Sequence, residues 1–357
     1  MERTSQEFFE NLLSTPSPSG AEEAAVRLWA SYARPFADRI EKDVHGNVMA
    51  VLNPEGAPRV MLAGHIDEIG FMVSHISKEG YVSFAQIGGH DLQIIQGMRV
   101  KVLSAKGPVT GLIGKKPIHL LKAEERKKVP ETEDLWIDIG AKNVREAKRI
   151  VEVGDAIVID VKYENLRNGF AVARGFDDRA GAFVVVEALR LLSKSRPKAA
   201  VYAVATVQEE VGLRGAKTSA FGIDPQVGIA VDVTHAMDYP GVGRERASFG
   251  DLSLGKGPVL SRGPNINPKV FARLQAAAKK RRIAFQVEAA PGGTGTDANA
   301  IQVSRAGVAT GLVSIPNRYM HTPCEMVCLK DVENAAKLLA AFVEGLDGKS
   351  AFIPSEG

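Results

Sequence analysis

The stretch that decides the fold is residues 199–210, Ala-Ala-Val-Tyr-Ala-Val-Ala-Thr-Val-Gln-Glu-Glu. Its first nine residues form an apolar run typical of a strand buried on both faces of a sheet. The run ends in two adjacent carboxylates, Glu209 and Glu210, which repel each other and lose hydration when a strand end is buried. A metal cation would remove this cost, because one carboxylate could bind the ion while the other moves protons. The stretch therefore predicts a metal site at a strand end if other segments supply further ligands.

Other segments of the chain also place polar side chains beside predicted strands and helices. Strands are expected at 59–64, 227–233 and 307–315, and helices at 179–193, 268–282 and 331–346. Five polar clusters lie at the ends of these elements: His65-x-Asp67, Asp177-Asp178, Glu209-Glu210, Asp232 and His321. The carboxyl ends of strands in an open α/β sheet meet at one crevice, so clusters that are distant in sequence can converge there.

The ligand types in these clusters indicate which ions would fit. Imidazole and carboxylate groups without an essential thiolate suit Zn²⁺, Co²⁺ or Mn²⁺, and carboxylates can bridge two ions in a hydrolase. Each cluster also has a simpler explanation: Asp177-Asp178 could cap the following helix, Glu209-Glu210 could begin a surface loop, and His321 could be a core histidine. One shared metal site accounts for all five polar clusters, whereas the simpler explanations would need a separate coincidence for each cluster.

The residue pattern of the sequence changes between about Ile69 and Tyr163. Short β-like pieces are separated by glycines there, which predicts a small all-β module. Within it, the polar run from Lys122 to Asp134 is expected to be a solvated loop. The simplest organisation is one α/β domain made of residues 1–68 and 164–357, interrupted by a β-rich insert at residues 69–163.

Composition limits the classes of function. Among 357 residues, 45% are hydrophobic and 24% charged, as in an ordinary soluble globular protein. The formal net charge of +3 is too small to indicate a nucleic-acid partner or a membrane surface. No apolar stretch is long enough to span a bilayer, and no signal peptide is apparent. Two cysteines form no disulfide framework, so a cytoplasmic setting is expected.

Five ordered motifs contain the polar clusters, and together they cover nearly the whole chain. They are Ala63-Gly-His-Ile-Asp-Glu-Ile-Gly70, Gly175-Phe-Asp-Asp-Arg-Ala-Gly181, Gln208-Glu-Glu-Val-Gly-Leu-Arg-Gly-Ala216, Val231-Asp-Val-Thr-His235 and Arg318-Tyr-Met-His-Thr322. This set resembles that of the tetrahedral aminopeptidases, a family of glutamyl and deblocking aminopeptidases in which some members are labelled cellulase M.

The resemblance implies a fold, an activity and an assembly. The fold would be an α/β mixed-sheet di-zinc peptidase domain of the phosphorylase/hydrolase-like kind, with helices on both faces and a small β-barrel or PDZ-like insert used for dimerisation. The activity would be removal of N-terminal residues from peptides that carry a free N-terminus. The protein would be a cytoplasmic homo-oligomer of the kind that assembles into a tetrahedral dodecamer, with two divalent metal ions per subunit.

The resemblance also assigns the ligands, motif by motif. One ion would be held by His65 and Asp232, and the other by Glu210 and His321. Asp177 would bridge the two ions, although the sequence leaves an exchange of roles with the neighbouring aspartate open. Zn²⁺ is the expected metal, with Co²⁺ and Mn²⁺ as alternatives.

Two further acids receive roles from the same resemblance. Asp67 would accept a hydrogen bond from the His65 ring and fix its orientation. Glu209 would be the general base, taking a proton from the attacking water and delivering it to the leaving amine. Successive residues of a strand point to opposite faces, so Glu209 and Glu210 can serve one site only if the backbone turns at the strand end. The division of roles between them comes from the resemblance alone.

Several other signals leave alternatives open. The glycine-rich segment 291–297 lacks the lysine of a phosphate loop; Asp297 could cap a helix there, or the segment could line a substrate pocket. Cys324 and Cys328 are more readily buried thiols than zinc ligands with His321, and His235 could support Asp232. The rival functions are a glycosidase, which would need two carboxylates and leave the histidines unexplained, and a non-catalytic scaffold of the same fold.

Overall fold

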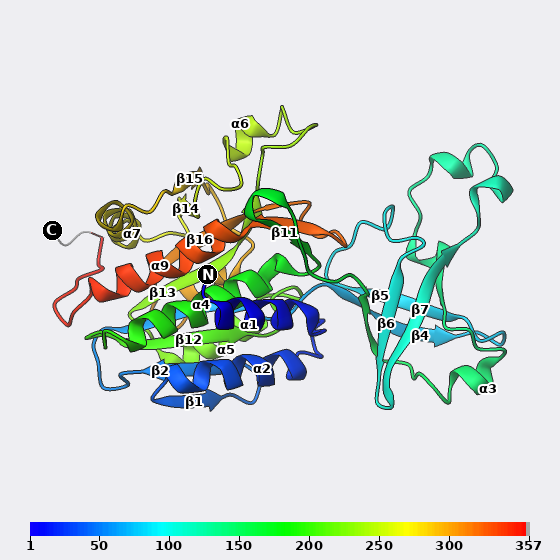
Figure 1. Ribbon diagram of the computed structural model, residues 1–357, viewed down its shortest axis with the longest axis horizontal. Helices are drawn as coiled ribbons and strands as arrows, with labels where there is room; N and C mark the ends of the chain where they lie inside the picture. The colour runs from blue at the N-terminus through cyan, green and yellow to red at the C-terminus, as the bar shows by residue number, and fades with distance from the viewer. Residues whose placement is uncertain (355–357) are drawn as a thin grey trace.

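The structure is a computed structural model that describes residues 1–354. It combines a large layered α/β part with a β-barrel beside it (Figure 1). The order of the main sheet is β1-β2-β12-β3-β13-β16-β17-β11-β10, with β14 and β15 attached to β16. Its strands are β1 (Arg39–Lys42), β2 (Val48–Leu52), β3 (Arg59–His65), β10 (Glu164–Asn165), β11 (Phe170–Ala173), β12 (Ala200–Thr206), β13 (Val227–His235), β14 (Val259–Arg262), β15 (Gln286–Ala289), β16 (Ala309–Arg318) and β17 (Glu325–Cys328).

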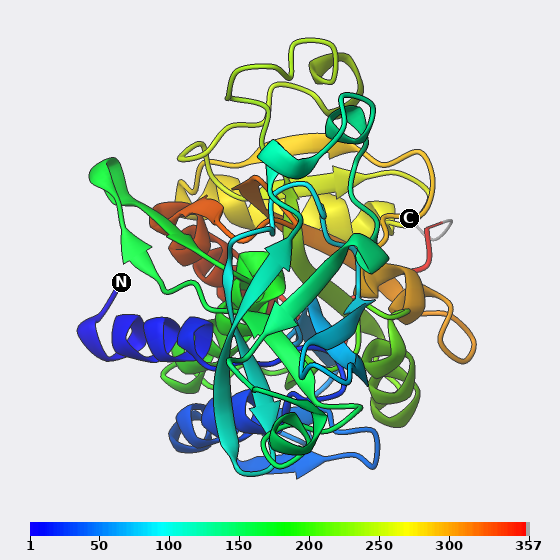
Figure 2. The same cartoon turned by 90° about the vertical axis from the view of Figure 1, so that its right-hand side faces the viewer.

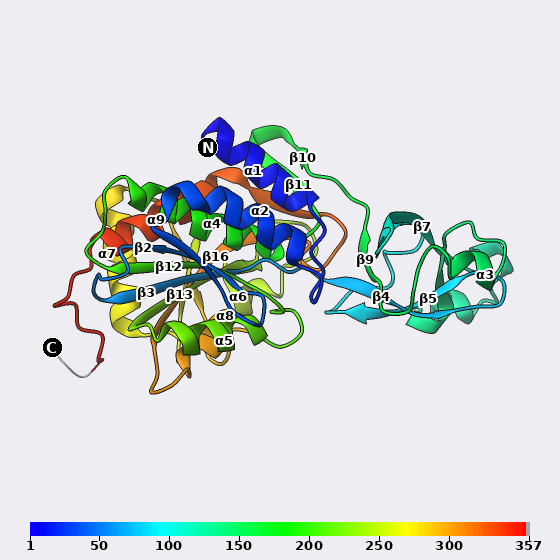
Figure 3. The ribbon, with the colours of Figure 1, turned by 90° about the horizontal axis from the view of Figure 1, so that it is seen from below.

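Helices cover both faces of this sheet (Figure 3). One face carries α1 (Arg3–Ser14), α2 (Glu23–Ala33), α4 (Phe176–Ser193) and α9 (Leu329–Glu344), and the other carries α5 (Arg214–Ile223) and α8 (Asp297–Gln302). The remaining helices are α3 (Val144–Ala147), α6 (Arg246–Phe249), α7 (Pro268–Arg281) and the 3₁₀ turns η1 (Arg34–Phe36), η2 (Ile118–Leu120), η3 (Glu125–Lys127), η4 (Thr132–Asp134) and η5 (Arg167–Gly169). The predicted mixed-sheet α/β class is confirmed.

The four central strands β12, β3, β13 and β16 are parallel, and every residue of β12 is buried. Burial on both faces explains why these strands are continuous apolar runs rather than alternating ones. Helix α4 is buried over almost its whole surface, because the sheet, α1 and α9 all pack against it. Its apolar residues therefore surround the helix instead of forming one stripe.

The barrel closes in the order β4-β5-β8-β7-β6-β9 and faces the viewer in Figure 2. Its strands are β4 (Gly70–Ile76), β5 (Val82–Ile87), β6 (Arg99–Ser104), β7 (Gly107–Lys115), β8 (Leu135–Asp138) and β9 (Ala156–Ile159). A separate hydrophobic core fills it, which includes Phe71, Phe84 and Ile137. The chain enters the barrel directly after β3 and returns to the main sheet at β10, so the last residue of β3 lies close to the junction. No helix within residues 1–354 is long and apolar enough to cross a membrane.

Candidate metal centre

The central sheet opens where its parallel strands end. The pairing of β3 with β13 stops at Ala63 and Ala230, whereas β13 continues to pair with β16 as far as His235 and Asn317. The two strands therefore part at their carboxyl ends, which is where α/β sheets bind ligands. A cleft of about 610 Å³ lies there, lined by residues that include His65, Asp177, Glu209, Glu210, Asp232 and His321. The structure thus brings five sequence clusters to one place.

Two glycines allow α4 to begin beside His65. A Cβ atom on Gly64 would lie 2.4 Å from the carbonyl carbon of Gly181, and a Cβ atom on Gly181 would lie 2.2 Å from Asp178 Oδ2. Because both side chains are absent, Asp178 can accept hydrogen bonds from the backbone N–H of His65 at 3.2 Å and of Gly181 at 2.9 Å. Asp178 is therefore bound to backbone, which leaves Asp177 to face the cleft.

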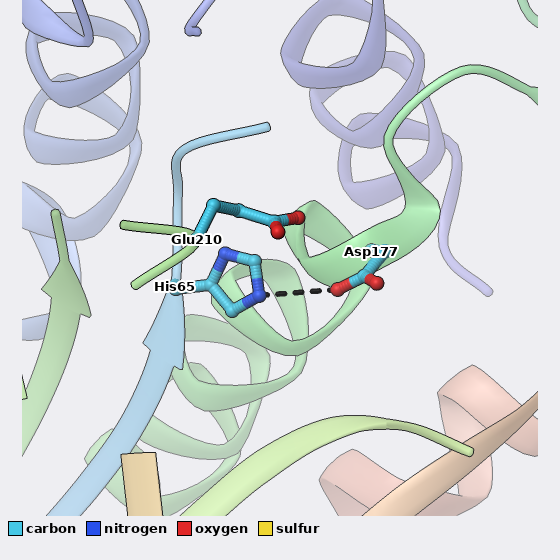
Figure 4. A group of neighbouring side chains, drawn as sticks. All are labelled: His65, Asp177 and Glu210. Atoms are coloured by element: carbon cyan, nitrogen blue, oxygen red, sulfur yellow. Dashed lines mark hydrogen bonds and ion pairs between the residues drawn. The ribbon is translucent and has the colours of Figure 1, made fainter. Parts of the chain in front are cut away.

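Asp177 lies between two imidazoles. Its Oδ1 is 3.1 Å from His65 Nε2, and its Oδ2 is 3.2 Å from His321 Nε2. Figure 4 shows His65, Asp177 and Glu210 converging from β3, from the start of α4 and from the turn after β12. Ligand atoms of these three residues lie within 4.8 Å of one another, as do those of His65, Asp178 and Asp232. Asp177 therefore presents one carboxylate oxygen to each imidazole.

The chain turns sharply between β12 and the glutamate pair. Gln208 has a φ of 56°, in the left-handed region that non-glycine residues seldom adopt. Asp67 stabilises the turn, because its Oδ1 accepts the N–H of Glu209 at 3.0 Å and its Oδ2 accepts the N–H of Glu210 at 3.2 Å. Both glutamates consequently reach one site: Glu209 Oε2 lies 3.8 Å from His65 Nε2.

Asp67 differs in one contact from the expectation. His65 Nδ1 lies 3.1 Å from the main-chain oxygen of Asp67 and 3.5 Å from the Asp67 carboxylate oxygen Oδ1. The carboxylate is occupied instead by the two glutamate N–H groups and by the hydroxyl of Ser19 at 2.7 Å. Buried backbone N–H groups need hydrogen-bond acceptors, and at this turn the Asp67 carboxylate supplies them. Asp67 therefore holds both the ring, through its backbone, and the turn, through its side chain.

The electrostatics of the cleft favour a bound cation. Burial, with help from neighbouring carboxylates, raises the pKa of Glu209 to about 10 and that of Asp232 to about 8. Burial alone would lower the pKa of His65, but Glu209, Asp177 and Asp67 raise it well above its ordinary value. The buried Glu210 Oε1 has no hydrogen-bond partner among residues 1–354. Crowded acids, imidazoles and one unpaired oxygen are a donor set that fits divalent metal ions.

Glu325 is a residue that the sequence reasoning missed. It is buried, and its two oxygens accept the backbone N–H groups of Asp177 at 2.9 Å and of His321 at 3.1 Å. Burial raises its pKa to about 8. The only available signal was an acid beginning a short apolar strand next to the cysteines. Cys324 is exposed and Cys328 is buried, and neither joins a possible metal cluster in the described part of the chain.

The barrel also contributes to the site. His321 Nδ1 lies 3.0 Å from the carbonyl oxygen of Gly89, which follows β5. A Cβ atom on the neighbouring Gly88 would lie 2.6 Å from the Ile69 side chain and 3.3 Å from Glu210 Oε2. The loop after β5 therefore passes close to the cleft only because it has no side chains there, and its backbone orients the His321 ring.

Two further expectations concern the rim of the cleft. The cap of α8 is Thr296, whose hydroxyl accepts the N–H of Ala298, so the prediction that Asp297 caps this helix was wrong. Asp297 instead accepts a hydrogen bond from the Thr206 hydroxyl at 2.5 Å. The segment before it, 291–296, does line the cleft. His235 also lines the cleft, with its ring packed edge-on against Phe249, and burial lowers its pKa.

Comparisons with known proteins show which family the chain resembles. The model of the M42 glutamyl aminopeptidase family matches residues 46–338. A lysyl aminopeptidase from Pyrococcus furiosus is 38% identical, with 95% of this chain and 97% of the relative covered. A solved TET aminopeptidase from a marine sediment archaeon of the Thaumarchaeota is 39% identical, covers 96% of this chain and 97% of its own, and has a TM-score of 0.91.

Two other solved structures bear on assembly and on the rival function. The Pyrococcus horikoshii TET1 peptidase, described as assembling into a tetrahedron or an octahedral shell, is 33% identical, with a TM-score of 0.85 and 96% and 100% of the two chains covered. A Thermotoga maritima structure that bears the name endoglucanase is 31% identical, with a TM-score of 0.75 and 94% and 96% coverage. The glycosidase name therefore also occurs among proteins of this fold.

Proposed function

Since the chain belongs to the M42 glutamyl aminopeptidase family and is a metal-dependent aminopeptidase, we propose that it works through two divalent ions held at the cleft. His65 and Asp232 would hold one ion, Glu210 and His321 the other, and Asp177 would bridge them. The observation that carries this proposal is the Asp177 carboxylate, with one oxygen 3.1 Å and the other 3.2 Å from the two imidazoles. Zn²⁺ suits these ligands, and Co²⁺ or Mn²⁺ would also be accepted.

The residues of the chain would divide the chemistry between them. When bound, the metal would lower the pKa of a water toward about 7 and polarise the peptide carbonyl. Glu209, held by the bond from its N–H to Asp67, would take the proton of the attacking water and pass it to the leaving amine. Glu325 would keep Asp177 and His321 in place through their backbone N–H groups. A glycosidase would leave both imidazoles without a role.

A pair of substitutions tests this division. Glu209→Gln should lower turnover by about 10²–10⁴-fold while the metal content per subunit stays unchanged, because a general base is lost but no ligand. Glu210→Gln, the matched control beside it, should lose bound metal. Turnover on aminoacyl p-nitroanilides and metal content by plasma emission spectrometry separate the two effects. Full turnover in the Glu209 variant would refute the base assignment, and an undiminished metal content in the Glu210 variant would refute the ligand assignment.

We further propose that the chain divides into a catalytic domain, residues 1–68 and 164–357, and an oligomerisation domain, residues 69–163. Exposed apolar side chains on the barrel side support this role, among them Ile118 at 61% and Leu120 at 66% exposure. A homo-oligomer, up to a tetrahedral dodecamer, and peptides with a free N-terminus would then be its partners. Because both cysteines are free, a reducing cytoplasm is the proposed location. Light scattering that gives a monomer at micromolar concentration would overturn the assembly.

A further inference from the structure

Glu288 is a carboxylate in the wall of the same cleft that the proposed chemistry does not use. It lies on β15, opposite Ser261 of β14, and is half-buried. Its Oε1 accepts a hydrogen bond from the Ser261 hydroxyl at 2.5 Å, and its Oε2 accepts one from the Thr234 hydroxyl at 2.8 Å. Both hydroxyl residues are buried. The carboxylate is therefore fixed in one position instead of rotating freely in solvent.

No cation neutralises this carboxylate in the described part of the chain. None of the ion pairs found within residues 1–354 includes Glu288. Among the described residues that line the cleft there is no lysine and no arginine. Of its imidazoles, His65 and His321 contact the Asp177 carboxylate, and burial lowers the pKa of His235. A fixed carboxylate in a partly enclosed cleft binds a cation more strongly than an exposed one does, because solvent screens it less.

The distance of Glu288 from the metal centre suits a substrate side chain. Thr234, its hydrogen-bond partner, is two residues beyond Asp232 on β13, so both side chains point to the same face of the strand. Two residues of an extended strand advance about 7 Å. A long side chain attached to the N-terminal residue could therefore extend from the reacting bond to Glu288.

The wall of the cleft also offers apolar surface for the stem of such a side chain. Phe249, Leu312 and Met320 line it together with the polar groups. Lysine and arginine bury their methylene stems against apolar surface while the charged end reaches a polar partner. A glutamate or aspartate at the same position would meet Glu288, and no lysine or arginine in the lining would offset the repulsion.

We propose that Glu288 is a specificity-determining residue that selects peptides whose N-terminal residue is lysine or arginine. This inference rests on the proposed function of the cleft and adds the substrate class. The aliphatic stem packs against the apolar wall, and the cationic end pairs with the carboxylate held by Ser261 and Thr234. Acidic N-terminal residues are poor substrates, even though the family carries the name glutamyl aminopeptidase.

The test uses the metal-loaded full-length enzyme and p-nitroanilides of lysine, arginine, leucine and glutamate. We expect the wild type to prefer lysine and arginine, with glutamate hydrolysed most slowly. Glu288→Gln should lower kcat/KM for the lysine and arginine substrates by about 10–100-fold, which is the effect of losing a charge-assisted hydrogen bond. The kcat/KM for the leucine substrate should stay within about threefold of the wild-type value. Glu245→Gln, which removes an exposed acid outside the cleft lining, is the control and should change none of the four.

Direct binding keeps this inference separable from the activity itself. Isothermal titration with lysinamide and leucinamide should show tighter binding of lysinamide to the wild type and equal binding to Glu288→Gln. Equal binding by the wild type, or a wild-type preference for the glutamate substrate, would overturn the proposal. An equal loss of kcat/KM for the leucine and lysine substrates in Glu288→Gln would also overturn the proposal, because it would place Glu288 on the substrate's α-amino group. Selective lysinamide binding without hydrolysis of any substrate would instead overturn the proposed function alone.

Discussion

Gly64 of β3 packs directly against the backbone of Gly181 in α4 beside the metal centre, and this contact gives the sharpest prediction. A Cβ atom added at Gly64 would stand 2.4 Å from the Gly181 carbonyl carbon, whereas ordinary contacts begin near 3.4 Å. In Gly64→Ala the strand and the helix must therefore separate by about 1 Å. The bond from the His65 N–H to Asp178, now 3.2 Å, would stretch beyond hydrogen-bonding range.

This displacement sets the expected magnitudes. Overpacking of this kind costs about 1–3 kcal/mol of the free energy of unfolding, and each kcal/mol lowers Tm by about 2–4 °C in a domain of moderate size. Because Asp177 moves with α4 while His65 stays on β3, kcat/KM should fall by about 10²-fold, as expected for a misplacement near 1 Å. Both quantities are measured on metal-loaded enzyme, by thermal unfolding and by p-nitroanilide hydrolysis.

Gly222→Ala in α5 is the matched control, because no atom lies within 4 Å of the added Cβ. It should keep full activity and gain about 0.4–1 kcal/mol in stability, since alanine restricts the unfolded chain. The reasoning is refuted if Gly64→Ala unfolds within about 1 °C of the wild type and retains its turnover. Such a result would mean that the contact between β3 and α4 can relax without disturbing the site.

Three further predictions concern the barrel, the metal and the surface. Gly88→Ala should cut kcat/KM, because its Cβ would lie 2.6 Å from Ile69 and push the barrel loop from the cleft, whereas Gly97→Ala, also at positive φ but with open space, should not. Chelation should abolish hydrolysis and lower Tm, with both restored by Zn²⁺ or Co²⁺, because ligands that bind only the folded state stabilise it; unchanged Tm would count against a resident metal. Asp238 pairs with Arg318 at 2.7 Å, and although burial opposes it, that pairing lowers the Asp238 pKa. Asp238→Asn should therefore be less stable than the wild type at pH 7. The difference in unfolding free energy should begin to shrink below about pH 4, the ordinary pKa of an aspartate, and should keep falling as the pH drops through the lowered pKa of the folded state. A difference that does not decrease at all between about pH 5 and pH 3 would contradict this.

Local patterns predicted the architecture well. The expected strand at 59–64 is β3, the run at 199–207 contains β12, and the helix expected at 179–193 is α4, which begins three residues earlier. Continuous apolar runs reveal doubly buried strands because burial on two faces leaves no position for a polar residue. The aminopeptidase family was likewise predicted, from five ordered motifs, and is confirmed by the family match over residues 46–338. The assignment of each ligand stays a prediction.

Sequence by itself determined which residue types were available, namely imidazoles and carboxylates at the ends of strands and helices. The division into an α/β domain and a β-rich insert stays a prediction. Only the tertiary structure decided the roles of these side chains. It turned Asp177 toward the cleft and Asp178 toward backbone, and it placed the barrel's Gly89 carbonyl on the His321 ring. The physical reason is separation along the chain: His65 and Asp177 lie 112 residues apart, and Gly89 and His321 lie 232 apart. Periodicity reports only local burial, whereas these contacts depend on the paths of distant backbones.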